Sequence, residues 1–205
     1  NYMKIGDRHT PSYSLTNSGK EEKAFNFGLH YHLKNFDIKF YYNYVDLDLA
    51  LLRSSIFHSG NAISKALSSD VPLFIRPFSY DINEPNQVVK HHLAKASINW
   101  WYKENEKVSL IIGRQLNKRK EFDVRRNAEK PIINLDLIST DLMLEWDHSF
   151  SENVEGLMGL HFFNQDNDNN PGTGTTPFIP NYNTNRYSFY LVEGLKLGEN
   201  FFEFG

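Results

Sequence analysis

The feature that most constrains this chain is a strict alternation of apolar and polar residues over long stretches. Between positions 24 and 33 the apolar residues stand at the odd positions: Phe25, Phe27, Leu29, Tyr31 and Leu33. Successive side chains of a β-strand point to opposite faces of the sheet, so the pattern predicts a strand with one apolar face. The alternation resumes over 36–46 after the two-residue turn Lys34–Asn35, and the pair of stretches predicts a β-hairpin.

The same alternation predicts five further strands and the start of an eighth. We expect them at 88–102, 108–117, 138–146, 154–162, 187–195 and 201–205. The connections alternate in length, because the turns near 34–35, 103–106 and 149–153 are short, whereas 47–87, 118–131 and 164–184 are long. All the long connections are therefore expected at one end of the sheet, and a short helix is expected at 61–67. Outer-membrane barrels have this asymmetry, with tight periplasmic turns and long extracellular loops.

Strand length separates a membrane barrel from a soluble β-sandwich or soluble ligand-binding barrel. About ten residues at 3.3 Å, tilted by about 45°, rise roughly 23 Å, which matches the apolar band of a membrane barrel. Typical soluble strands have about five or six residues. Trp100, Tyr102 and Trp146 stand at the ends of strands beside short turns, where an interfacial aromatic girdle is expected. The sequence favours an all-β fold, an antiparallel transmembrane β-barrel segment of about seven or eight strands, with the soluble folds as the alternative.

Composition excludes several other classes. The mean hydropathy is −0.53 and no long apolar run exists, so a transmembrane helix is not expected, whereas alternating barrel strands give such an average. The absence of cysteine excludes disulfides, and the net charge of −3 gives no sign of nucleic-acid binding. No catalytic arrangement or phosphate-binding loop is recognisable, so we expect neither an enzyme nor a cofactor. Asp166, Asp168 and Asn170 resemble the start of a calcium loop, but Pro171 and Pro177 replace its glycine and glutamate, so a solvated turn is expected.

Arg114 is the one charged residue on the apolar side of its expected strand. It lies toward the long-connection end, where a charge on a barrel surface costs about 0–1 kcal/mol rather than about 2–4 kcal/mol at the midplane. Its long stem can carry the guanidinium to anionic headgroups, or the register of the strand can shift locally.

Several segments of the sequence resemble TonB-dependent receptors of the kind common in Bacteroidetes. The similar segments are Asp7–Tyr13, Leu15–Gly19, His58–Asn61, Asp81–Pro85, His91–Lys95 and Gln115–Arg126, with a weaker match at Ile179–Tyr182. They are spread over most of the chain, and their order makes the resemblance more specific than any single segment. The chain is most similar to the iron-complex branch of this family, which includes ferric-citrate receptors.

The resemblance implies the cell outer membrane as the location, and a barrel of about 22 strands around an N-terminal plug. Such receptors import an iron chelate using energy delivered through TonB. Residues 1–205 are then expected to be a partial β-barrel domain, with the plug domain, the signal peptide and the C-terminal strands outside this sequence. The expected partners are the iron-chelate ligand, the protein's own plug, TonB through the missing N-terminal part, and outer-membrane lipid and lipopolysaccharide.

Candidate ligand residues come from the second long connection and its flanks. Arg114–Lys130 contains seven basic and three acidic residues, and arginine suits bidentate binding of carboxylate or phosphate. Arg119, Arg125 and Arg126 are therefore candidates for an extracellular vestibule that binds an anionic ferric chelate. Ordinary loop charge, or bridging to lipopolysaccharide or plug carboxylates, is the alternative. His91 is expected to face the lumen near the outer mouth.

Two other features bear on the site and on the class of protein. His30 and His32 share one face, but with no carboxylate or third histidine recognised nearby in the sequence they are expected to form hydrogen bonds in the lumen rather than to bind a metal. A passive porin or structural outer-membrane barrel remains an alternative to the receptor, and a soluble binding module is a third.

Overall fold

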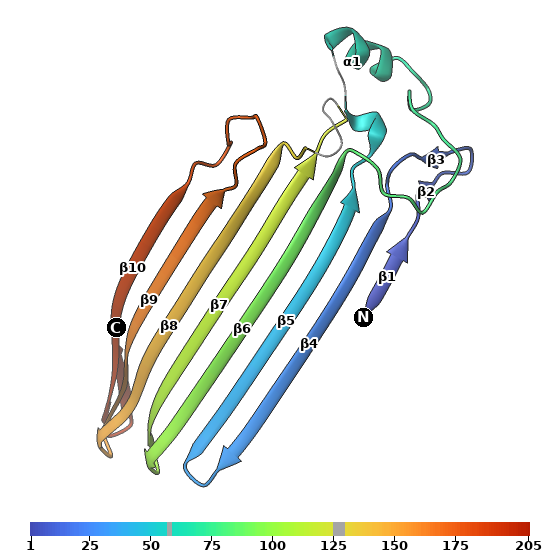
Figure 1. The fold of residues 1–205 in the computed structure, drawn as a ribbon. Helices are drawn as coiled ribbons and strands as arrows, with labels where there is room; N and C mark the ends of the chain where they lie inside the picture. Colours follow the sequence, from blue (N-terminus) through green and yellow to red (C-terminus); the bar gives the residue numbers. More distant parts are fainter. Residues whose placement is uncertain (57–58, 125–129) are drawn as a thin grey trace.

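A computed structural model, which describes residues 1–56, 59–124 and 130–205, contains one large antiparallel β-sheet. Its nine strands lie in the order β1-β4-β5-β6-β7-β8-β9-β10-β11, and β2 and β3 form a separate hairpin (Figure 1). The elements are β1 (Tyr2–Ile5), β2 (Arg8–His9), β3 (Ser14–Leu15), β4 (Lys20–Leu33), β5 (Phe36–Ala50), η1 (Arg53–Ser55), α1 (Gly60–Leu67), β6 (Asn86–Lys103), β7 (Glu106–Phe122), β8 (Ile133–Ser151), β9 (Val154–Asn169), β10 (Tyr182–Leu197) and β11 (Asn200–Phe204).

The all-β class and the antiparallel pairing are confirmed. Each of the eight expected strands forms, as β4 to β11, and each pairs with its neighbour in sequence. The sheet is open, because within the described residues β1 and β11 are its two edges and no pairing closes a barrel. The short strand β1 was not expected, since its four residues are too few to show a periodic pattern, yet it pairs with β4 from Tyr2↔Lys23 to Ile5↔Lys20.

The strands are longer than the alternation predicted, so all three expected long loops are partly wrong. Strand β5 continues through residues 47–50, and β6 begins at Asn86, within the first expected connection. Strand β7 continues through residues 118–122, which were expected to begin a charged loop. Strand β9 continues to Asn169, so residues 164–169 are not part of a solvated turn. Polar cross-strand contacts hold these extensions in the sheet: Lys118 Nζ lies 3.2 Å from Asp136 Oδ2, and Asn183 Nδ2 donates to Asp166 Oδ2 at 3.0 Å. Charged and amide side chains therefore extend these strands beyond the apolar stretches.

The expected asymmetry of the connections is confirmed. The turns 34–35, 104–105, 152–153 and 198–199 are short, whereas the strands that flank the long connections 51–85, 123–132 and 170–181 all meet them at the other end of the sheet (Figure 1). Helix α1 stands in the first long connection, close to its expected range, and Ser59 caps it by accepting a hydrogen bond from the Ala62 amide at 3.3 Å. Within the described ranges, no helix has the length and apolar character needed to cross a membrane.

The strand register brings the apolar residues of β4 to β10 onto one face, which we call the apolar face. Three successive rows cross all seven strands. They are Leu29, Phe40, Ala96, Ile112, Leu142, Phe162 and Tyr187; then Tyr31, Ile38, Ile98, Leu110, Leu144, Leu160 and Phe189; then Leu33, Phe36, Trp100, Val108, Trp146, Met158 and Leu191. The faces expected for the first six strands are confirmed, and the register assigns Tyr187, Phe189 and Leu191 of β10 to the same face.

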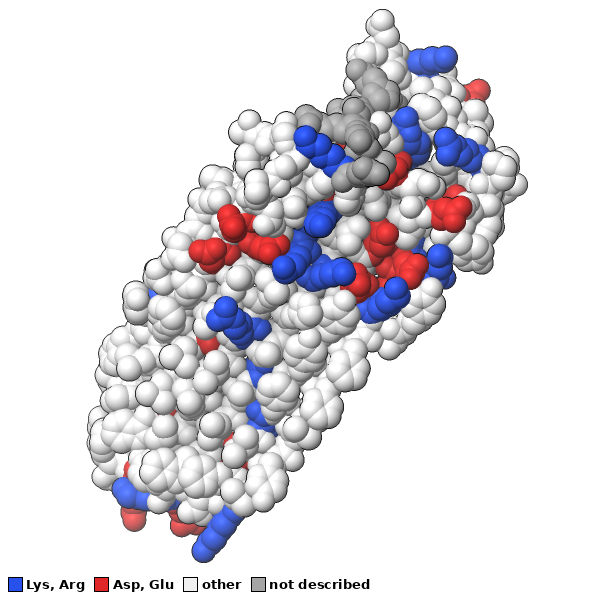
Figure 2. All heavy atoms as spheres, in the orientation of Figure 1, with Lys and Arg blue, Asp and Glu red and all other residues white. Residues whose placement is uncertain are grey.

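No second layer covers the apolar face in the part of the chain that the structure describes. Phe25, Leu160 and Phe189 are 56%, 56% and 64% exposed, and apart from Pro85 the only buried apolar side chain in the described ranges is Ala50. A contiguous apolar surface of this extent marks a site of contact with another apolar surface. Figure 2 shows charged side chains gathered toward the long-connection end and at the short turns, with a mostly uncharged zone between them.

Arg114 does lie on the same side of the sheet as the apolar face, and no local shift of register displaces it. It pairs with Ala94 on β6 and Thr140 on β8 in an uninterrupted ladder, and it is exposed. The small Ala94 and Thr140 side chains leave room for the arginine stem to lie along the sheet.

Candidate functional site

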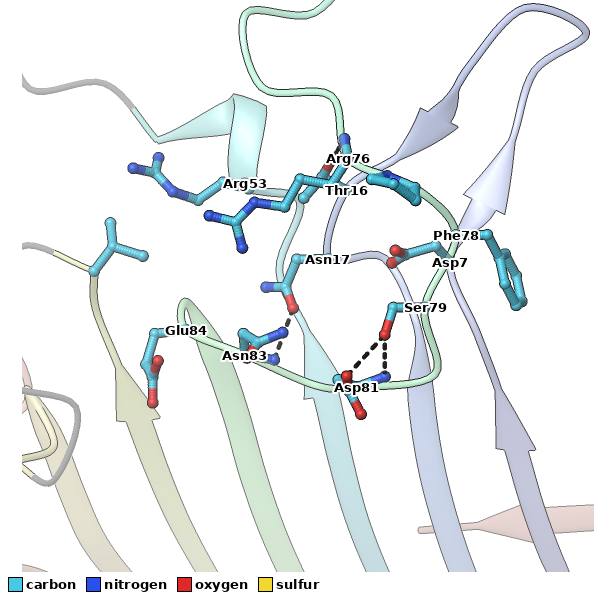
Figure 3. Close-up of a pocket in the computed structure, with 12 residues that line it drawn as sticks. Asp7, Thr16, Asn17, Arg53, Arg76, Phe78, Ser79, Asp81, Asn83 and Glu84 are labelled. Atoms are coloured by element: carbon cyan, nitrogen blue, oxygen red, sulfur yellow. Dashed lines mark hydrogen bonds between the residues drawn. The ribbon is translucent and has the colours of Figure 1, made fainter.

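A hollow with a volume of about 640 Å³ lies at the long-connection end of the sheet. The N-terminal segment forms one wall, and the first long connection folds around the other sides (Figure 3). Its lining residues are Asp7, Thr16, Asn17, Arg53, Arg76, Pro77, Phe78, Ser79, Asp81, Asn83, Glu84 and Val124.

Asn17 fastens the N-terminal segment to the first long connection. Its amide Nδ2 donates to the carbonyls of Leu51 and Pro85, each at 2.8 Å, and its Oδ1 accepts from the Asn83 amide at 2.9 Å. The residue is 4% exposed and has a φ of 62°, a left-handed conformation that asparagine tolerates better than most side chains. One buried side chain therefore links both ends of the connection that forms the hollow.

Close packing continues along the N-terminal segment. The Asp7 amide donates to the Ser79 carbonyl at 2.9 Å, and the Asp7 carboxylate accepts from the Ser18 amide at 2.9 Å. Gly6 lies against the Phe78 ring, so closely that an added Cβ would be 2.5 Å from Phe78 Cζ. The wall of the hollow is thus held by specific polar and steric contacts rather than by an apolar core.

Two arginines face the hollow without an acidic partner. Arg53 lies over the Phe74 ring, 4.1 Å from its centroid, and the backbone amide of Arg76 donates to Thr16 Oγ1 at 2.8 Å. Both guanidinium groups extend across the hollow (Figure 3), and in the described ranges no carboxylate lies at ion-pair distance from either. Guanidinium groups suit bidentate binding of a carboxylate or phosphate, so this side of the hollow can hold an anionic group, whereas Asp7, Asp81 and Glu84 line its other sides.

The structure separates the residues that the sequence proposed for a ligand site. Arg119 on β7 and His91 on β6 lie on the face opposite the apolar face, and the register places them near each other through the pairs Val89↔Arg119 and His91↔Asn117. Arg119 forms an ion pair with Glu121, and His91 Nδ1 lies 3.3 Å from Asn117 Nδ2. Neither Arg119 nor His91 lines the hollow that Arg53 and Arg76 face. Arg125 and Arg126 lie outside the described residues.

Arg119 instead stands at the rim of a second hollow of about 470 Å³. This hollow lies between the ends of β8 and β9 and the third long connection. Its lining is mainly apolar and includes Ile132, Ile133, Pro177, Phe178 and Ile179. It therefore offers apolar contact area with one cation at its edge.

Sequence reasoning missed Arg53 and Arg76 because each stands alone in a stretch without periodicity. Only the fold of the first long connection, fastened by Asn17, brings them to one hollow. The available signal was their position, since both belong to a long connection at the same end as the predicted vestibule.

The expectation that no carboxylate lies near His30 and His32 is wrong. The hairpin turn brings Asp37 beside both: His30 Nε2 contacts its carboxylate, and His32 Nδ1 lies 3.6 Å from Asp37 Oδ1. Lys39 Nζ also lies 3.0 Å from Asp37 Oδ2, so a cation neutralises this carboxylate. Across residues 1–56, 59–124 and 130–205, no group of three or more histidine, aspartate or glutamate side chains is arranged so that it could hold a metal ion.

Comparison of the chain with protein-family models, with curated protein sequences and with solved structures finds no significant match.

Proposed function

We propose that this chain is part of the wall of a transmembrane β-barrel in a bacterial outer membrane, and that the barrel belongs to a TonB-dependent receptor for anionic iron complexes. The observation that carries the proposal is the set of three uncovered apolar rows across seven neighbouring strands. A bilayer interior is an apolar environment that covers such a face evenly from strand to strand. Long loops would then face outside and short turns the periplasm.

The dimensions and margins of the apolar face support this proposal. The stretch from Phe25 to Leu33 extends roughly 26 Å along the strand, or roughly 20 Å across a wall tilted by about 40°, close to the band of about 25 Å in membrane barrels. Aromatic residues mark its short-turn margin: Trp146 Nε1 donates to the Tyr102 hydroxyl at 2.5 Å, and the rings of Tyr102 and Trp100 lie 5.6 Å apart. Such groups suit a membrane–water interface because they are both apolar and polar.

The apolar zone also changes height along the sheet in the manner expected of tilted strands. One row contains Phe27 and Tyr42 on β4 and β5 but Asn164 and Asn185 on β9 and β10. Toward the short turns, the next residue on this face of β10 is Glu193, whose Oε1 lies 2.9 Å from His148 Nε2, and Leu195 follows it. Rows perpendicular to tilted strands are inclined to the membrane plane, so a level apolar band must cross from row to row.

The opposite face has the character of a polar barrel interior. Its side chains form hydrogen bonds between strands, as His161 Nε2 does with Asp141 Oδ2 at 3.0 Å and the Tyr190 hydroxyl with Glu145 Oε1 at 2.6 Å. Polar groups paired in this way suit a lumen that holds water or a plug. Arg53 and Arg76 stand at the long-loop end, where an incoming anionic chelate would arrive.

Cysteine labelling tests the topology, because the natural sequence contains no cysteine. We expect Leu67→Cys on α1 to react with a membrane-impermeant maleimide in intact cells, and Lys34→Cys at a short turn to react only after the outer membrane is permeabilised. Leu144→Cys, within the apolar face, should stay unlabelled in both conditions. Equal labelling at all three positions in a protein that stays soluble without detergent would contradict a membrane barrel and favour a soluble binding module.

Binding and uptake of ferric citrate by the receptor test the proposed ligand. Charge-assisted hydrogen bonds contribute about 1.5–3 kcal/mol each, so Arg53→Ala with Arg76→Ala should weaken ferric citrate binding by about tenfold or more. Arg8→Ala with Lys65→Ala removes two cations at the same end that do not line the hollow, and should leave binding unchanged. Uptake that persists without the proton-motive force would instead favour a passive porin.

A further inference from the structure

A row of six charged residues crosses the sheet just beyond the apolar face, on the same side and toward the long connections. We call it the charged strip: Lys23, Asp46, Lys90, Lys118, Asp136 and Asp168, from β4 to β9. Positive and negative residues do not simply alternate in it. Lys90 on β6 is paired directly opposite Lys118 on β7, so two lysines are neighbours at its centre.

Like charges directly opposite on neighbouring strands destabilise a sheet unless an anion lies between them. Each lysine has one flanking carboxylate: Lys118 Nζ lies 3.2 Å from Asp136 Oδ2, and Lys90 Nζ lies 3.7 Å from Asp46 Oδ2. Both lysine side chains remain half exposed, at 51% and 52%. The flanking carboxylates occupy the outer sides of the pair, so the two lysines can still receive an anion from outside the sheet.

Two further cations on β7 enlarge the excess of positive charge. Arg114 and Lys120 share the strand and the face of Lys118, on either side of it, and both are exposed. In the described part of the chain neither forms an ion pair. Strands β6 and β7 therefore carry four cations on this face, of which Lys90 and Lys118 each contact one carboxylate. The acidic residues of the charged strip lie on β5, β8 and β9. The anion site is confined to the middle of the strip.

Position relative to the apolar face indicates which anion this cluster would receive. Arg114 lies within the apolar-facing side between Ala94 and Thr140. On the same face, Lys90 and Lys118 lie two rows further toward the long connections, and Lys120 lies three rows further. A molecule that contacts both regions needs an anionic head and apolar chains. A phosphorylated lipid has that chemistry, and its phosphate would lie at the membrane surface where lysine and arginine side chains reach.

We propose that Lys90, Lys118 and Lys120 bind a phosphate of a glycolipid headgroup in the outer leaflet, of the lipid A type, with the acyl chains of that lipid along the apolar face of β6 and β7 and Arg114 between the two regions. This site rests on the proposed membrane location, but it is separate from the hollow of Arg53 and Arg76 and does not depend on the identity of the imported ligand.

The test compares lipid binding by the natural protein and by a variant with Lys90→Gln and Lys118→Gln. The protein is purified in detergent and titrated with diphosphoryl lipid A and with its fully dephosphorylated form, and bound lipid is counted by native mass spectrometry. Removing two cations near the phosphate should weaken diphosphoryl lipid A binding by about tenfold or more, from about 1 kcal/mol for each cation at a lipid surface. The dephosphorylated lipid should bind the natural protein and the variant equally.

The matched control is Lys39→Gln with Lys95→Gln, which removes two lysines from the opposite face of β5 and β6. It should bind lipid A as the natural protein does. Equal binding by the Lys90/Lys118 variant, an equal loss in the control, or no preference for the phosphorylated lipid would each overturn the site.

Insertion into lipid vesicles, measured on the same samples, separates this inference from the proposed function. If the natural protein does not enter phosphatidylcholine vesicles, the membrane location fails and the lipid site fails with it. If the natural protein and both variants insert equally but lipid A binding is unaffected by the Lys90 and Lys118 substitutions, only the lipid site fails.

Discussion

The two faces of this sheet use the same strands in different ways. On the apolar face, side chains of the same character recur in row after row, and large ones such as Leu160 and Phe189 are exposed. On the opposite face, polar side chains find partners on other strands, as His161 of β9 does with Asp141 of β8, and Tyr190 of β10 with Glu145 of β8. Both faces lack a packed second layer in the described residues, so their difference is not one of core against surface.

The comparison shows that the two faces are stabilised by different surroundings. A polar face whose groups are hydrogen-bonded to each other is stable against water or other polar surroundings. An apolar face of this extent needs an apolar environment supplied from outside the chain. The sheet is therefore built to separate two environments, which is the physical basis for assigning it to a barrel wall.

The largest effect is expected from a charge placed in the middle of the apolar face. Leu144→Arg puts a guanidinium in the central apolar row, and a cation at the bilayer midplane costs about 2–4 kcal/mol. The adjacent Met143→Arg places the same group on the polar face, where we expect less than about 1 kcal/mol. Urea titration of folding into lipid vesicles, followed by tryptophan fluorescence, measures both. Equal costs would remove the distinction between the faces.

A smaller effect is expected from glycine substitutions on the polar face. Tyr190 lies across Gly159 to reach Glu145, and an added Cβ at Gly159 would overlap the tyrosine ring. Gly159→Ala should cost about 1–3 kcal/mol by displacing Tyr190 and breaking its hydrogen bond. Gly28→Ala is the control, because the nearest atom to its added Cβ is the Phe40 carbonyl oxygen at 3.8 Å. A neutral Gly159→Ala would show that the polar face does not depend on this contact.

The smallest effect is expected at the short-turn margin of the apolar face, and it depends on pH. The hydrogen bond from Lys103, with a further one from Tyr102, lowers the pKa of Glu106 from its ordinary value of 4.5. A carboxylate with a lowered pKa in the folded state contributes stability above pH 4.5, and this contribution is lost as the pH falls through the folded-state pKa. Thermal unfolding should therefore begin at lower temperature in acid.

A matched pair of variants shows whether Glu106 causes that pH dependence. Glu106→Gln should remove the part of the acid sensitivity that this margin contributes, whereas Glu152→Gln at the turn between β8 and β9 should preserve it, since within the described residues Glu152 forms no ion pair. The melting temperature from near-ultraviolet circular dichroism at neutral and acid pH is the measurement. Identical acid sensitivity in all three proteins would show that Glu106 does not stabilise the margin.

Much of the strand pattern was accessible from the sequence, and its limits have clear causes. Alternation along one strand is a local property, so the apolar sides of β4 and β5 and the turn at Lys34–Asn35 could be predicted. The polar extensions of β7 and β9 could not, because Lys118 and Asp166 stay in the sheet through partners on other strands. The candidate hollow was also inaccessible, since contacts such as those of Asn17 join segments that are far apart in the sequence.

The sequence by itself determined that the chain alternates, and hence that it forms long antiparallel strands with one apolar side. Only the tertiary structure decided which residues become neighbours across strands. Register places Lys90 opposite Lys118 and aligns the apolar residues of seven strands into continuous rows. The fold of the first long connection brings Arg53 and Arg76 to one hollow. Alternation depends on the geometry of a single strand, whereas these juxtapositions depend on pairing between distant segments, which no local pattern encodes.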